Sequence, residues 1–129
     1  MNMRILATLG IAFALAACGT VPIYTVNNAP VTTASGKAAE TAKVRQAILD
    51  AGAGLGWRMR DASPGVLNAT LDLRGHNAVV EIPYSQKTYS IKLKSSANLN
   101  ESDGQIHKNY NGWVQNLERA INAKISALN

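Results

Sequence analysis

Few residues of this sequence could do chemistry, and they lie far apart along the chain. It contains two histidines and one cysteine among 129 residues. His76 lies in the segment Gly75–Asn77, which is typical of a tight turn, so we expect an exposed turn residue there. His107 precedes a helical pattern, and we expect it to start that helix and bond to a nearby loop carbonyl rather than act as a ligand or base. Glu101 and Asp103 precede His107 at offsets that do not form an EF-hand loop, and we predict no metal site.

The sequence also lacks the motifs of common nucleotide-dependent and hydrolytic enzymes. It contains no G-x-x-x-x-G-K-S/T, no G-x-G-x-x-G opening a helix, no G-x-S-x-G and no H-E-x-x-H. Gly52, Gly54 and Gly56 are spaced like a phosphate-binding loop, but they follow a predicted helix, and we expect them to end it. We therefore predict no catalytic residue and no cofactor.

The chain begins with a segment typical of exported proteins. Residues 1–4 end in Arg4, and residues 5–17 form an uncharged run of apolar and small side chains. This run is shorter than the roughly 20 residues that a membrane-spanning helix needs. We predict that residues 1–17 are a signal peptide that is cleaved off.

The only cysteine of the chain directly follows this run. The residues at the boundary are Leu15, Ala16, Ala17, Cys18 and Gly19. They resemble the bacterial lipobox, in which small residues fit the signal peptidase and the cysteine thiol receives a diacylglycerol before cleavage. The resemblance implies a lipoprotein anchored in the cell envelope through Cys18, at the outer membrane facing the periplasm rather than at the inner membrane. Two alternatives stay open: Ala14–Ala16 also fits an ordinary A-x-A cleavage site, and Cys18 could be an unmodified thiol.

Residues 18–36 show neither helical nor sustained alternating periodicity. Pro22, Pro30 and several Asn and Gly residues interrupt the segment. We predict a flexible tether behind the lipidated cysteine, with an average reach of roughly 23 Å, enough to hold a domain clear of lipid headgroups. The alternative is that Ile23–Val26 adds an edge strand to the domain.

The remaining residues, 37–129, have the length of one small domain. Val44, Ile48, Ala51 and Leu55 recur at helical spacing, and four segments then alternate with period two, at 57–60, 67–74, 79–84 and 88–94. A final helix begins near Ile106. Its apolar stripe consists of Tyr110, Trp113, Val114, Leu117, Ile121, Ile125 and Leu128. We predict an α+β fold: a two-layer sandwich in which a four-stranded antiparallel meander carries the N-terminal and C-terminal helices on one face.

Alternation places charged side chains on the other face of this sheet. Its cations are Arg58, Arg60, Arg74, Lys92 and Lys94, which outnumber Asp72 and Glu81. This face could bind a phosphate-bearing lipid headgroup or an acidic envelope protein, although alternation alone also predicts charges there for solubility. The net charge of +5 suits anionic partners in the envelope, where nucleic acid is largely absent. Trp57, Trp113 and Tyr110 could stack on a sugar, but they fall on core stripes and we assign them to the core.

From Gly56 onward the chain resembles a family of small proteobacterial lipoproteins. The residues that carry the resemblance are Gly56–Trp57, Tyr89–Ile91, Ser96–Leu99 and the run Ile106–Leu117, with its pattern I-H-x-x-Y-N-x-W-V-x-N-L. The resemblance implies a shared fold and lipid anchoring, and it carries no established activity. We therefore expect a membrane-tethered, non-enzymatic binding or assembly module. The alternatives are a small enzyme acting on an envelope polymer and a periplasmic ligand carrier.

Replacing Cys18 with Ala tests the anchor, because the thioether to the diacylglycerol needs the cysteine sulfur. The variant should lose labelling by a fatty-acid analogue and leave the membrane fraction. Labelling that persists in the variant would contradict the lipoprotein prediction.

Overall fold

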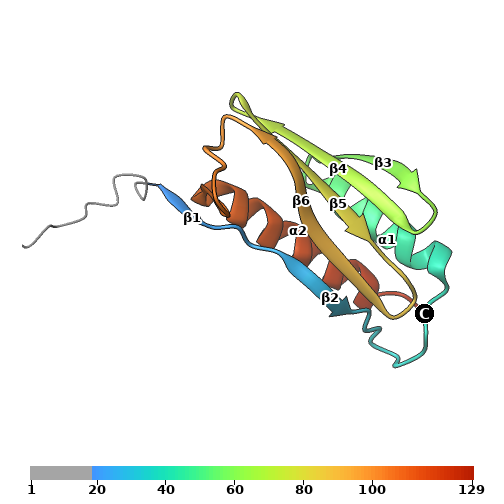
Figure 1. The fold of residues 1–129 in the computed structure, drawn as a ribbon. Coiled ribbons are helices and arrows are strands. Elements are labelled where there is room, and N and C mark those ends of the chain that lie inside the picture. Colours follow the sequence, from blue (N-terminus) through green and yellow to red (C-terminus); the bar gives the residue numbers. More distant parts are fainter. Residues whose placement is uncertain (1–18) are drawn as a thin grey trace, which may run out of the picture.

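The computed structural model describes residues 19–129, so the predicted signal peptidase recognition residues Leu15, Ala16 and Ala17 and the predicted lipid attachment at Cys18 lie outside the described residues. The elements follow one another as β1 (Thr20–Pro22), β2 (Val26–Pro30), α1 (Thr41–Gly54), β3 (Arg58–Ser63), β4 (Val66–Leu73), β5 (His76–Pro83), β6 (Thr88–Ala97), β7 (Gln105–His107) and α2 (Lys108–Ser126) (Figure 1). Within residues 19–129, neither helix combines the length and apolar character needed to cross a membrane.

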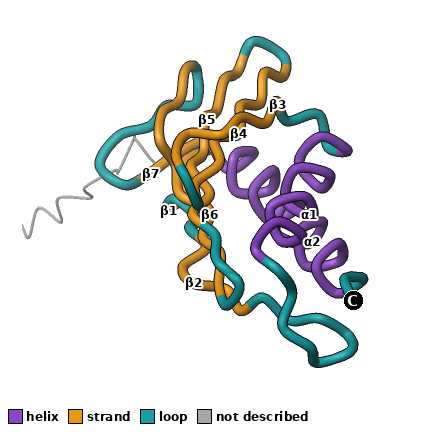
Figure 2. Tube along the Cα trace, turned by 90° about the vertical axis from the view of Figure 1, so that its right-hand side faces the viewer, coloured by secondary structure: helices purple, strands orange, loops and turns teal. Residues whose placement is uncertain are grey.

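The elements form two layers. A five-stranded antiparallel sheet has the order β2-β6-β5-β4-β3, and both helices lie against one of its faces (Figure 2). Beside it, β1 and β7 form a separate two-stranded sheet. The predicted α+β class and the antiparallel meander β3–β6 are therefore confirmed. The prediction of only four strands was wrong, because β2 adds a fifth at the β6 edge.

The core lies between the sheet and the helices, where the apolar faces predicted from the periodicity pack together. Alternate side chains of β4 and β5 and the stripe of α2 are buried; they are Leu67, Ala69, Leu71, Ala78, Val80, Ile82, Tyr110, Val114, Leu117, Ile121 and Ile125. Trp57 is also buried, as expected. Trp113 packs against this core but stays half-buried at its margin, so its assignment to the core is only partly right.

Close packing between α1 and β3 explains why a glycine stands at position 52, inside the first helix. Gly52 is buried inside α1, and a Cβ atom there would lie 2.3 Å from Sδ of Met59. The helix continues to Gly54, and Gly56 follows with a φ of +88°, which suits glycine. Arg45 of α1 also binds Asp61 of β3 through two hydrogen bonds, at 2.9 and 2.6 Å. These bonds lower the pKa of the Asp61 carboxyl.

The segment that we expected to be a flexible tether is part of the fold. In β1, Val21 pairs with Ile106, and in β2, Val26 pairs with Ile91. A bulge between Val26 and Ala29 interrupts the register of β2, which is why the sequence shows no sustained alternation there. The edge-strand alternative was therefore closer to the structure, although the strand lies at Val26–Pro30. The fold therefore includes Thr20–Pro30 and does not begin at Lys37.

A protein that begins at Lys37 should therefore be much less stable than one that begins at Gly19. The shorter protein loses Val26, which is 4% exposed, and uncovers Ile91 and Ile106. Losing this burial should lower the free energy of unfolding by about 3 kcal/mol or more. Urea unfolding of both proteins measures the difference, and equal midpoints would show that β1 and β2 contribute little.

Candidate functional site

The two histidines lie together at one end of the domain, although they are 31 positions apart in the sequence and were expected in a turn and at a helix start. His76 opens β5, because the turn is formed by Arg74 and Gly75, with φ of +53° and +79°. The rings of His76 and His107 are stacked with centroids 6.0 Å apart, and the ring of Trp113 lies 6.2 Å from that of His76. The prediction that His76 is an exposed turn residue was therefore wrong.

Hydrogen bonds determine which ring nitrogens of this pair carry protons. Nδ1 of His76 lies 2.6 Å from the carbonyl oxygen of Asn98, which can only accept, so Nδ1 is the donor. Nδ1 of His107 accepts from the backbone N–H of Asn109 at 3.1 Å and caps α2. His107 does start the helix, and its backbone N–H donates to the loop carbonyl of Leu99 at 2.8 Å, while its ring accepts from an N–H. Among the described residues, no three metal-binding side chains gather in one place.

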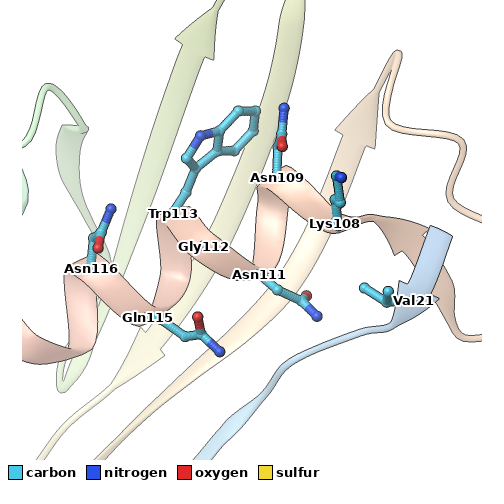
Figure 3. A pocket seen from close by; sticks show the side chains of 8 residues that line it. All are labelled: Val21, Lys108, Asn109, Asn111, Gly112, Trp113, Gln115 and Asn116. Carbon is cyan, nitrogen blue, oxygen red and sulfur yellow. The ribbon is translucent and has the colours of Figure 1, made fainter. Parts of the chain in front are cut away.

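Several exposed apolar side chains lie near Trp113, next to the histidines and among polar neighbours. Leu55 and Leu73 are large apolar side chains that stay 43% and 42% exposed, and with Trp113 they line a hollow of about 220 Å³. A second, shallower hollow of about 540 Å³ includes Trp113 and Val21 (Figure 3). Apart from Gly112, its other lining residues are polar: Lys108, Asn109, Asn111, Gln115 and Asn116. We call Val21, Leu55, Leu73 and Trp113 the Trp113 surface. Its residues come from four parts of the chain, so no local pattern in the sequence could have shown it.

The segment that leads to Cys18 is fastened to α2 beside this surface. The carbonyl of Gly19 accepts from the backbone N–H of Lys108 at 2.9 Å. The side-chain amide of Asn111 donates to the carbonyl of Pro22 and accepts from the N–H of Tyr24, both at 2.9 Å. In Figure 3, Asn111 extends from α2 toward β1. One side chain thus satisfies two backbone groups of a segment nearly 90 positions away in sequence.

The tyrosine at the end of this fastened segment adds a further contact to α2. The hydroxyl of Tyr24 donates to Oε1 of Glu118 at 2.6 Å, and this hydrogen bond raises the pKa of the Tyr24 hydroxyl. Further along the sheet, the hydroxyl of Tyr89 donates to Oδ1 of Asn122 at 2.6 Å. Two tyrosines from the β2 side of the sheet layer therefore bind the polar flank of α2.

The open face of the sheet brings together only part of the predicted cationic set. Arg58 forms an ion pair with Asp72 at 2.5 Å. The pKa of the Asp72 carboxyl is lowered by its hydrogen bonds from Asn77 and Arg58. Arg74 lies in the β4–β5 turn, so its assignment to the sheet face was wrong. The reason is that β4 ends at Leu73, where alternation stops.

Three cations remain near this face without a carboxylate partner. The register places Arg60 opposite Asn68, and Glu81 opposite Lys92, so Arg60 and Lys92 end one row across four strands. Lys94 lies at a bulge of β6, between Leu93 and Ser95, which pair with successive residues of β5. Among the described residues, none of these three cations forms an ion pair. The face is therefore cationic at its two sides and carries Glu81 between them.

Comparison with known proteins finds no similar protein. No protein-family model matches the chain. No curated protein and no solved structure is significantly similar to it. The resemblance to small proteobacterial lipoproteins therefore stays a prediction, and the function has to be argued from the geometry.

Replacing Asn111 with Ala should release the first segment from α2, because two backbone groups lose their partner. We expect the segment to lose about 1 to 2 kcal/mol of stability. Hydrogen exchange at the amides of Ile23 and Tyr24 should speed up accordingly. Asn109→Ala is the matched control on the same helix, since its side chain is exposed and only its backbone N–H is used. Equal exchange in both variants would show that Asn111 does not hold the segment.

Proposed function

We propose that this protein is an exported lipoprotein that uses the open face of its sheet to bind an acidic protein of the cell envelope. It is held at a membrane by lipids on Cys18 and works without catalysis. The observation that carries the proposal is the uncovered sheet face, on which Arg60 and Lys92 form no ion pair within residues 19–129. The lipobox-like residues Leu15–Cys18 support export and anchoring.

The open face is a rigid platform, because its side chains stand on paired strands. The helices cover only the opposite face (Figure 2), so both sides of the cationic row are accessible to a partner. Arg60 and Lys92 are both exposed. Their charges are therefore available for attraction to a partner of opposite charge, and this attraction should weaken as salt rises.

The spacing of the cations favours a protein over a single lipid headgroup. Arg60 and Lys92 lie on strands three positions apart in the sheet, and neighbouring strands are about 4.8 Å apart, so they are separated by roughly 14 Å. One phosphate group could contact both only if the two side chains extended fully toward each other across the face. An acidic protein surface or an extended acidic segment that crosses the strands can contact both.

A photo-crosslinking amino acid at Thr70 tests this proposal, because Thr70 lies on the open face and leaves both cations in place. We expect it to capture one recurrent acidic protein in cells. Combining it with Arg60→Glu and Lys92→Glu should reduce the yield, since two surface charge contacts of about 0.5 to 1 kcal/mol each correspond to roughly a fivefold to thirtyfold change.

Lys43 provides the matched control position, because it is an exposed cation on the helix layer. A crosslinker there should not capture the same protein. The proposal fails if Thr70 and Lys43 capture the same set of proteins, or if the charge reversals leave the yield at Thr70 unchanged.

A further inference from the structure

The anchor residue is attached to the folded domain without a spacer. Cys18 directly precedes Gly19, and the Gly19 carbonyl is already bound to the start of α2. Consecutive Cα atoms are about 3.8 Å apart. A lipid on Cys18 therefore cannot hold this domain at the distance expected for a flexible tether. If Cys18 carries the lipid, this end of the domain lies close to the bilayer.

The part of the domain nearest to Cys18 carries the Trp113 surface. Thr20 pairs with His107, the His107 ring stacks on His76, and the His76 ring lies next to Trp113. Val21 and Trp113 line one hollow, and Trp113, Leu55 and Leu73 line the next. Figure 1 shows β1 and the start of α2 together at one end of the domain, and the C-terminus at the other. The exposed apolar side chains and the anchor thus share one end.

We propose that the Trp113 surface docks on the lipid bilayer to which Cys18 is attached. The inference rests on the proposed lipid anchor and adds an orientation to it. Trp113 would lie at the level of the headgroups, where tryptophan is enriched because its ring is apolar and its N–H is polar. Leu55 and Leu73 would enter the apolar boundary next to it, which removes their exposed surface from water.

Charges around the Trp113 surface have both signs, so apolar contact is the main attraction. Lys108 lines the hollow with Val21, and Arg74 follows Leu73 in the turn. Both can bind lipid phosphates. Glu101 and Asp103 lie in the loop before β7 and bring negative charge to the same end. We therefore expect docking on zwitterionic as well as anionic lipids.

Fluorescent probes on single cysteines can test the orientation in the full-length, lipid-modified protein. Acylation uses the thiol of Cys18, so an introduced cysteine is the only free thiol. Leu55→Cys and Leu73→Cys place an environment-sensitive nitrobenzoxadiazole probe on the Trp113 surface. Gln86→Cys is the control, because Gln86 is exposed in the hairpin between β5 and β6. All three positions are at the surface, so the fold should tolerate the changes.

On vesicles of phosphatidylethanolamine and phosphatidylglycerol, the probes at positions 55 and 73 should shift to the blue. They should also lose emission when the acyl chains are brominated, and the probe at position 86 should do neither. Protein that floats with the vesicles while all three probes report water would overturn the docking and leave the lipid anchor intact. Protein that does not float would overturn the anchor and the docking together.

Discussion

The side chain of Asn111, together with strand pairing to β7 and β6, holds the first described segment in place, and the order of the strands at that side of the sheet depends on this attachment. Its amide binds the backbone on both sides of Ile23. The residues before Ile23 can therefore pair with β7, while those after it run on to β6. Because β2 covers β6, Tyr89 and Ile91 become buried inner-strand residues. The edge strand on this side of the sheet is β2, and its bulge and Pro30 limit pairing with the strand of another molecule.

The two surfaces that we propose to be functional lie on different parts of the domain. The Trp113 surface comes from β1, the end of β4, the residue after α1 and the first half of α2, whereas the open sheet face runs along β3 to β6. A domain that rests on the bilayer by its Trp113 end would keep Arg60 and Lys92 accessible from the side. Anchoring and partner binding are therefore compatible in one small domain, and a long tether is not required for either.

Local periodicity is the reason that much of the fold could be predicted from the sequence. The alternation in β4 and β5 and the stripe of α2 each repeat over several turns or residue pairs, so each indicates its own element and its buried face. Together they predicted the meander, the helices on one face and the position of Arg58, Arg60 and Lys92 on the other. The expectation for β2 failed because its alternation is short and a bulge breaks it.

By itself, the sequence determined which side chains form the apolar faces of the helices and strands. Burying these faces is favourable whichever element they pack against. Only the tertiary structure decided the contacts between distant segments. It placed Asn111 on the backbone of Pro22 and Tyr24, His76 beside His107, and Gly52 against Met59. Each of these depends on strand register and helix position, which result from the packing of the whole chain and leave no periodic pattern in the sequence.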